Sequence, residues 1–333
     1  MTHAEATRRA AVVTRYGAPE VIALREIPLP TPGPRELRVR VKATTVSSGD
    51  ARLRGCRVPA GMGLPMRLAF GWKVPRQPVL GTECAGVVDA VGDAVTRFKV
   101  GDAVVAFPGA KMGAHAEFVC VGEDGRVAMK PEALSWGEAA ALLFGGTAAM
   151  HYLREAGVKR GERVLVLGAS GAVGVAAVQL ARVEGAEVTA VCSAANADLV
   201  RELGAGRVID YAVEDFTRDA ARWDVIVDCV GVTDYARCRP VLAPGGRLAR
   251  VACDLAGQLA APFQGRLSGH RVIAGVAAER AGDVRRLAEL ASEGAYRAVI
   301  DDTVPLARIA EAHARVDSGH KRGSVVVTVD DAA

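Results

Sequence analysis

The sequence has no run of five like charges, and its 42 Lys and Arg nearly balance 38 Asp and Glu, leaving a net charge of +4. This pattern argues against a basic stripe for nucleic acid and indicates a mixed, solvated surface. Low-complexity linkers and internal repeats are also missing, and 50% of the residues are hydrophobic. A disordered or fibrous protein is therefore excluded. The 333 residues are enough for two domains, each with its own core.

Its seven cysteines are odd in number and widely spaced, and no charged-then-apolar signal segment leads the chain. We therefore expect a reducing, cytoplasmic setting. The uncharged stretch Val164–Ala181 is nearly long enough to span a membrane. It contains glycines, a serine and a glutamine, which favour a strand, a glycine turn and the start of a helix. No membrane partner is expected.

Two patterns divide the chain. In the first 130 residues, short β-branched runs at Leu37–Val46, Gly86–Val91 and Ala103–Phe107 alternate with Gly, Pro and Asp. From about Leu134, apolar strands are separated by stretches long enough for helices, which predicts a parallel, doubly wound sheet. The predicted strands of this second part are Arg163–Leu167, Glu187–Cys192, Val208–Ile209, Val225–Asp228, Arg247–Val251 and Arg271–Val276.

The C-terminal segment follows neither pattern strongly. Apolar residues recur at roughly helical spacing in Glu279–Glu293 and Leu306–Val316, and Ser324–Val329 resembles a strand. The pattern alone leaves the domain of this segment unassigned.

A glycine-rich turn follows the predicted strand Arg163–Leu167 and precedes the predicted helix Val175–Glu184. Glycines at such a turn let the backbone approach a pyrophosphate, which the N–H groups and dipole of the helix stabilise. The match is A-x-G-x-x-G, because Ala169 stands where the strict motif has its first glycine. Within a complete strand-turn-helix-strand unit, the motif predicts dinucleotide binding rather than a tight turn with no ligand.

The second strand of this unit ends at Cys192-Ser193, with no carboxylate there to hold the ribose 2′-hydroxyl of NAD. A carboxylate would repel a 2′-phosphate, so Ser193 in its place favours NADP(H) over NAD(H). No Arg or Lys lies between Ser193 and Asp198 to pair with the phosphate.

Several motifs together resemble the medium-chain dehydrogenase/reductase superfamily, and within it the zinc-free quinone oxidoreductase-like branch. The resemblance implies an α/β fold: a GroES-like β-barrel domain at 1–131, a Rossmann doubly wound parallel sheet domain at 132–276, and a segment at 277–333 that returns to the first domain. It also implies a homodimer paired through the edge strand Arg271–Ala277. The motifs are Tyr16–Glu20, Gly81–Val88, Val91-Gly92, Phe98–Asp102, Gly168–Gly174, Leu203–Tyr211, Asp228–Gly231 and Gly245–Arg247.

Carried over by residue, the resemblance implies a set of cofactor contacts. Ser193 and Tyr211 would lie beside the 2′-phosphate, Thr147 near the cofactor in the cleft between domains, and backbone near Gly231 and Val251 along the nicotinamide. The less favoured alternatives are that Tyr211 is an exposed turn residue and that Thr147 is a helix residue bonded to its own backbone. Gly168 would also contact the cofactor, and the pyrophosphate would be held by Ala169, Ser170, Gly171, Ala172, Val173 and Gly174.

A catalytic zinc needs about three Cys, His or carboxylate ligands. Zinc-binding relatives supply a Cys and a Gly-His-Glu, whereas this chain has Ser47 and Gly81-Thr82-Glu83. The two thiols Cys84 and Cys120 are scattered and more typical of core residues. We expect no metal site.

Without zinc to form an alkoxide, alcohol oxidation is disfavoured, and hydride transfer to a quinone or an α,β-unsaturated carbonyl is favoured. Asp50 and Ser47 are the candidate catalytic residues, although Asp50 could be a solvated turn aspartate. Phe107 and Phe144 are candidate walls of the substrate pocket, or core residues. His115 and His151 fit structural roles better than catalytic ones.

Three hypotheses about the function of the protein remain. The first is a reductase of the kind just described, acting on a small-molecule substrate. The others are a non-catalytic NADPH-binding protein of the same fold that acts through complexes, and an NAD(P)-dependent alcohol dehydrogenase. A short-chain dehydrogenase is excluded, because no tyrosine has a lysine four residues later.

Overall fold

The computed structural model describes residues 6–58 and 60–329. The chain divides into two compact units. Unit 1 contains the residues up to Val58, Gly63–Phe144 and the segment from Glu279 onward, and unit 2 contains Gly145–Ala278 with a short loop ending at Met62. The resemblance implies a boundary between residues 131 and 132, whereas this division falls after Phe144, inside a helix.

Unit 1 is rich in β-structure. Its elements are β1 (Thr7–Val13), β2 (Ile22–Pro28), β3 (Glu36–Val46), α1 (Ser48–Gly55), α2 (Gly63–Phe70), β4 (Cys84–Val91), β5 (Ala103–Ala106), β6 (Phe118–Gly122), β7 (Val127–Met129), α3 (Trp136–Ala140), α9 (Ala281–Ser292), β14 (Ile300–Pro305), α10 (Ile309–Asp317) and β15 (Ser324–Thr328). The main sheet has the order β14-β15-β3-β4-β5-β7, with β6 paired to β3, while β1 and β2 form a separate antiparallel pair. The C-terminal strand β15 therefore lies beside β3, a strand from the start of the chain.

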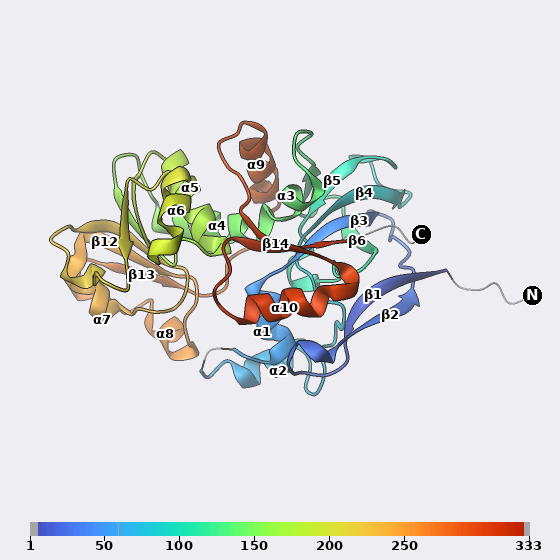
Figure 1. Cartoon of the computed structure of the whole chain (residues 1–333), viewed down its shortest axis with the longest axis horizontal. Coiled ribbons are helices and arrows are strands. Elements are labelled where there is room, and N and C mark those ends of the chain that lie inside the picture. Colours follow the sequence, from blue (N-terminus) through green and yellow to red (C-terminus); the bar gives the residue numbers. More distant parts are fainter. Residues whose placement is uncertain (1–5, 59, 330–333) are drawn as a thin grey trace, which may run out of the picture. The chain divides into compact units, whose positions relative to one another are not determined.

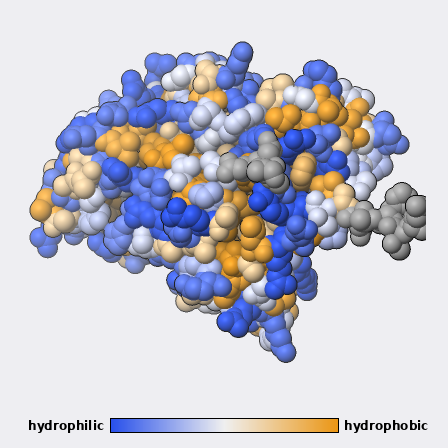
Figure 2. Space-filling view, turned by 45° about the vertical axis from the view of Figure 1, so that its right-hand side comes forward, coloured by the Kyte–Doolittle hydropathy of each residue, from blue (hydrophilic) through white to orange (hydrophobic). Residues whose placement is uncertain are grey.

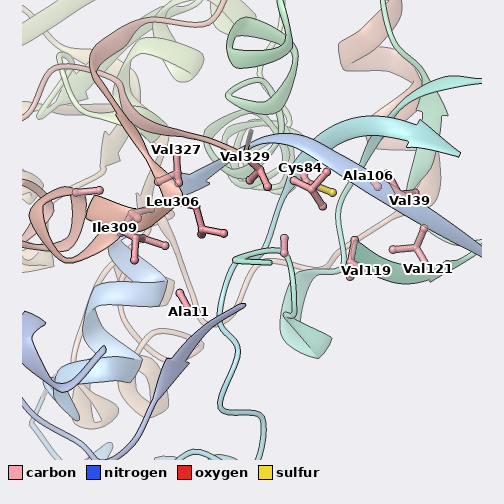
Figure 3. Packing of buried hydrophobic residues seen from close by; sticks show 14 of the residues in the cluster. Ala11, Val39, Cys84, Ala106, Val119, Val121, Leu306, Ile309, Val327 and Val329 are labelled. Carbon is pink, nitrogen blue, oxygen red and sulfur yellow. The ribbon is translucent and has the colours of Figure 1, made fainter. Parts of the chain in front are cut away.

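One hydrophobic core contains residues from both the N-terminal and the C-terminal part of unit 1. Val39 of β3 and Ala106 of β5 belong to the same buried cluster as Leu306, Ile309 and Val327 from the C-terminal segment (Figure 3). Helix α10 lies beside α1 (Figure 1). Burial of apolar surface is worth roughly 25 cal/mol per Å², so this shared core fixes the C-terminal segment within unit 1.

Unit 2 is built on a parallel sheet. Its elements are α4 (Leu143–Ala156, which begins in unit 1), β8 (Arg163–Leu167), α5 (Ala172–Val183), β9 (Glu187–Cys192), α6 (Ala197–Glu202), β10 (Arg207–Asp210), β11 (Trp223–Asp228), α7 (Tyr235–Cys238), β12 (Leu242–Arg250), α8 (Leu255–Ala260) and β13 (Arg271–Ala274). The order β10-β9-β8-β11-β12-β13 is the 3-2-1-4-5-6 order of a Rossmann fold. The order reverses between β8 and β11, so ligands are expected at the carboxyl ends of these strands.

The uncharged stretch Val164–Ala181 forms β8, a turn and most of α5, as its glycines predict. Among the described residues, no helix is long and apolar enough to cross a membrane. On the face shown in Figure 2, hydrophobic patches are interrupted by hydrophilic side chains, in line with the balanced composition.

Candidate functional site

The loop after β8 turns tightly into α5. Gly168 has a φ of +72°, a conformation that glycine adopts without steric cost. A Cβ on Gly168 would lie 2.1 Å from Cγ2 of Val230, and one on Gly174 would lie 2.2 Å from the Gly168 oxygen. These two glycines are therefore needed for the turn itself and for the close packing of α5 onto it.

Gly171 stands in more open surroundings. A Cβ there would meet only the Gly168 oxygen, at 3.6 Å, which is an ordinary contact. Gly171 is the N-cap of α5, and no side chain caps this end. The first-turn N–H groups of Ala172, Val173 and Gly174 thus lie where a helix favours an anion. The N–H of Ala169, by contrast, donates to the Val191 oxygen at 3.0 Å.

Ser193 and Tyr211 lie at the ends of neighbouring strands. Ser193 follows β9 and Tyr211 follows β10, and Asp210 pairs with Cys192 in parallel register. The Tyr211 N–H donates to the Cys192 oxygen at 3.3 Å. The Tyr211 side chain is 65% exposed. The structure therefore brings this predicted pair to one edge of the sheet.

Asn196 is a polar residue that the sequence pattern did not single out. Its side-chain Nδ2 lies 3.1 Å from Oγ of Ser170 and 3.2 Å from Oγ of Ser193. It thereby connects the glycine loop after β8 with the end of β9. Its partner Ser170 is 26 positions away, so a local motif gives no sign of this contact.

Thr147 lies on α4, a helix that packs against the start of α5. A Cβ on Gly145, two residues earlier, would lie 2.2 Å from the oxygen of Ala172. Thr147 is buried, with 5% exposure. The glycine at 145 thus permits the approach that brings α4 to the glycine loop.

Gly231 and Val251 follow the adjacent strands β11 and β12. Asp228, at the end of β11, accepts hydrogen bonds from the N–H groups of Val230, Gly231 and Thr233 at 2.8–3.1 Å. The Val251 N–H donates to the Asp228 main-chain oxygen at 2.9 Å. This buried carboxylate therefore shapes the loop that the resemblance assigns to the nicotinamide.

In unit 1, Ser47 and Asp50 form a capping box at the start of α1. Ser47 donates to Oδ2 of Asp50 through its N–H at 2.8 Å and its hydroxyl at 2.6 Å, and the Gly81 N–H donates to Oδ1 at 3.0 Å. Asp50 is fully buried, so the alternative of a solvated turn aspartate is wrong. Both carboxylate oxygens are engaged in holding backbone.

Glu83 is a buried carboxyl group that the sequence pattern left without a role. Its Oε1 accepts from the Thr45 hydroxyl, and its Oε2 accepts from the N–H groups of Leu143 at 3.0 Å and Phe144 at 2.6 Å. Glu83 therefore caps the N-terminus of α4. Burial raises the pKa of Glu83 to about 7, partly opposed by these hydrogen bonds. Its partners are 38 to 61 positions away, which explains why no local motif revealed them.

The two predicted pocket residues differ in their surroundings. Phe144 is half-buried, and a Cβ on Gly49 would lie 3.5 Å from its ring. It therefore lies against the first turn of α1, close to Ser47. Phe107 is 6% exposed, and its ring faces the guanidinium of Arg126 at 5.7 Å. Phe107 is thus almost completely buried, and Phe144 is the more accessible of the two rings.

The two histidines considered in the sequence analysis both make hydrogen bonds to main-chain atoms. Nε2 of His115 lies 2.9 Å from the Thr45 oxygen, and its ring meets His313 edge-on with centroids 5.6 Å apart. Nδ1 of His151 accepts from the Ala278 N–H at 3.3 Å. His313 is fully buried, and burial lowers its pKa well below 6.5.

The residues at the zinc-ligand positions do not fit a catalytic zinc. Ser47 is used in the capping box, and Thr82 offers only a buried hydroxyl. Burial raises the pKa of the Cys84 thiol to about 12 and that of Cys120 to about 11, whereas zinc binds the thiolate. Cys84 lies in the apolar core (Figure 3). Within residues 6–58 and 60–329, no cluster of three His, Cys, Asp or Glu could hold a metal.

Two protein families match the chain. Residues 33–158 match the alcohol dehydrogenase GroES-like domain, and residues 203–327 match a zinc-binding dehydrogenase family. The first match confirms the GroES-like domain expected from the sequence, and the parallel sheet of unit 2 confirms the Rossmann domain.

Similar proteins cover nearly the whole chain. A quinone oxidoreductase from Pseudomonas aeruginosa is 32% identical over 330 residues, covering 94% of this chain and 97% of that protein. The solved quinone oxidoreductase from Coxiella burnetii superposes with a TM-score of 0.85 at 25% identity, covering 98% of this chain and 100% of the other. An NAD-dependent alcohol dehydrogenase superposes with a TM-score of 0.81 at 28% identity, covering 97% of this chain and 100% of the other.

Proposed function

Because the chain belongs to the medium-chain dehydrogenase/reductase superfamily and is quinone oxidoreductase-like within it, we propose that it is a zinc-independent reductase. In this proposal, NADP(H) is the cofactor and a quinone or an α,β-unsaturated carbonyl accepts the hydride. The setting is cytoplasmic, the assembly is a homodimer, and neither nucleic acid nor membrane is a partner.

The observation that carries the proposal is the chemistry at the zinc-ligand positions. Ser47 and Thr82 replace the Cys and His of zinc-binding relatives, and Ser47 already bonds to Asp50. Without zinc, the protein lacks the usual means of lowering the pKa of an alcohol. An acceptor that is already electrophilic needs only orientation and a dry site. Reduction of such an acceptor is therefore the reaction that these residues support best.

The chain offers a suitable cradle for the cofactor. The uncapped first turn of α5 supports pyrophosphate binding, and the Gly168 turn gives the backbone room to approach it. When bound, the nicotinamide supplies the hydride. Gly231 and Val251 would line its ring, with their loop held by Asp228.

Ser47 and Asp50 enter the proposal as positioning residues. Their hydrogen-bonding atoms hold each other and the Gly81 backbone, which fixes α1 beside the Phe144 ring. Phe107 and Phe144 would give the acceptor site apolar walls. The reduction is completed by a proton from solvent or from a nearby acid.

The test is a panel of quinones and enones offered to the purified protein with NADPH, while cofactor oxidation is followed. We expect turnover with at least one class, and we expect metal analysis to find far less than one zinc per chain. A protein that oxidised NADPH only after zinc was added would overturn the zinc-independent mechanism.

Two other functions have a specific observation in their favour. The similar solved alcohol dehydrogenase supports alcohol oxidation, which alcohols with NAD or NADP would reveal. Both carboxylate oxygens of Asp50 already accept hydrogen bonds, from Ser47 and from the Gly81 N–H, and this supports a non-catalytic NADPH-binding protein. Tight NADPH binding with no turnover across the whole panel would favour that second reading.

A further inference from the structure

Asn196 is the only asparagine in the 333-residue sequence. It lies at the end of a single 3₁₀ turn, Ala194–Asn196, and its N–H donates to the Ser193 oxygen at 2.9 Å. That turn folds the Asn196 side chain back toward the end of β9. The side chain of Asn196 then reaches both Ser193 and Ser170.

The Asn196 side chain points toward the two serines although its position at the start of α6 favours a different hydrogen bond. Asn196 is the N-cap residue of α6, where an asparagine side chain normally accepts a hydrogen bond from the first turn of the helix. Here the side chain makes no capping hydrogen bond. The stabilisation that capping gives, typically about 1 kcal/mol, is thus forgone, and the amide bonds to the two serines instead.

The direction of these hydrogen bonds determines what the serines can do. A hydroxyl group has one donor and two acceptor sites. Because Nδ2 of Asn196 donates to both Oγ atoms, each hydroxyl proton of Ser170 and Ser193 is left to donate elsewhere. The serine oxygens are within hydrogen-bond reach of one atom, so their protons can converge on one anion. All three residues are partly exposed, which gives a ligand access.

The charges near this cluster permit an anion to bind. Asp198 is the nearest carboxylate in sequence, and it pairs with Arg201 at 2.9 Å. No positive side chain lies between Ser193 and Asp198. Recognition of an anion here would therefore depend on oriented neutral donors, which are effective only if their protons are directed outward.

We propose that Asn196 is a specificity-determining residue that orients the Ser170 and Ser193 hydroxyls toward the 2′-phosphate of NADP(H). This inference rests on the proposed cofactor. Asn196 acts through the two serines and is a positioning residue. An asparagine meets this need because its amide donates two hydrogen bonds without adding charge. An aspartate at 196 would accept both serine protons and repel the phosphate.

The test measures the binding of 2′,5′-ADP and 5′-AMP, two ligands that differ only in the 2′-phosphate. Calorimetry gives the dissociation constants of both ligands for the unmodified protein and for the variants Asn196→Ala and Asn196→Asp. We expect the unmodified protein to bind 2′,5′-ADP more tightly. Asn196→Ala should weaken 2′,5′-ADP about tenfold, the scale of one hydrogen bond to a charged group. Asn196→Asp should weaken it further. Binding of 5′-AMP, the internal control for folding, should change less than about twofold.

The single asparagine also allows a direct observation. Protein labelled with ¹⁵N-asparagine has one side-chain amide signal pair, and 2′,5′-ADP should shift it more than 5′-AMP does. A preference for 2′,5′-ADP that survives in Asn196→Ala, or an amide signal that ignores both ligands, would overturn the role of Asn196 alone. An unmodified protein that binds both ligands equally would overturn the proposed NADP(H) preference and this inference together.

Discussion

Several buried carboxyl groups in this protein accept hydrogen bonds from main-chain N–H groups. Asp50 and Asp228 are fully buried, and each accepts main-chain N–H groups. Glu83 does the same for the start of α4. Hydrogen bonds to charged acceptors are among the stronger ones. A residue that the sequence suggests as catalytic, such as Asp50, can therefore have the role of fixing a loop or a helix end.

The cofactor preference depends on Ser193. Because Ser193 offers a hydroxyl where NAD enzymes have a carboxylate, NADPH should bind more tightly than NADH, by on the order of 1–3 kcal/mol. Ser193→Asp should reverse the preference, since it repels the phosphate and accepts the ribose hydroxyl. Dissociation constants of both cofactors for both proteins check this. A mutant that still prefers NADPH would show that Ser193 does not lie at the ribose.

The glycine loop gives a matched pair of substitutions. Gly171→Ala adds only an ordinary contact, so the variant should fold with an unchanged melting temperature and lose at least tenfold in NADPH affinity through contact with the pyrophosphate. Gly174→Ala places a Cβ 2.2 Å from the Gly168 oxygen and should lower the melting temperature itself. Calorimetry and thermal melts measure both. Unchanged NADPH affinity in Gly171→Ala would mean that this loop holds no phosphate.

Glu83 gives a prediction about pH. Its folded pKa of about 7 lies above the ordinary value of 4.5, so between these values the folded state retains a proton that the unfolded state has released. Stability therefore falls as pH rises through this window, by up to about 3 kcal/mol. Glu83→Gln removes this loss, so the variant should gain stability relative to the unmodified protein from pH 5 to pH 8.

Urea unfolding at several pH values checks the Glu83 prediction. Glu132→Gln, a change at an exposed carboxylate, is the control and should leave the pH profile parallel to that of the unmodified protein. A parallel profile for Glu83→Gln as well would contradict the raised pKa.

At the scale of elements, the sequence pattern predicted strands best where most residues of the strand are apolar and buried in the parallel sheet. The predicted strand Arg163–Leu167 is β8, and Glu187–Cys192 is β9. The first domain was harder, because α1 and α2 are short and neither shows a clear apolar period. The capping box Ser47–Asp50 was the available signal for α1. The roles of Glu83 and Asn196 depend on contacts between distant segments, which no local pattern contains.

The edge of the parallel sheet gives a prediction about assembly. β13 is the last strand in the sheet order, and Leu267 and Val276, which flank it in sequence, are 107% and 85% exposed. Exposed edges and apolar side chains favour pairing across a two-fold axis. Light scattering should therefore return twice the chain mass of 34.7 kDa, and Val276→Arg should shift the protein toward monomer. A monomer mass at micromolar concentration for the unmodified protein would argue against the dimer.

At the scale of the whole molecule, the chain carries a Rossmann sheet and a GroES-like domain in which Ser47 and Thr82 stand at the positions of two zinc ligands of zinc-binding relatives. The fold was predictable because its glycine turns and buried strands follow local rules. The acceptor was not, because a substrate pocket depends on contacts between distant segments, and a contact such as that between Phe144 and Gly49 follows no local pattern.

The most direct test of the central claim is the rate of NADPH oxidation by chelator-treated, metal-analysed protein in the presence of a quinone or enone acceptor. For a zinc-independent reductase we expect a rate equal to that of the untreated protein, with one NADPH oxidised for each two-electron reduction of the acceptor. Activity that disappears with the metal and returns with stoichiometric zinc would contradict it.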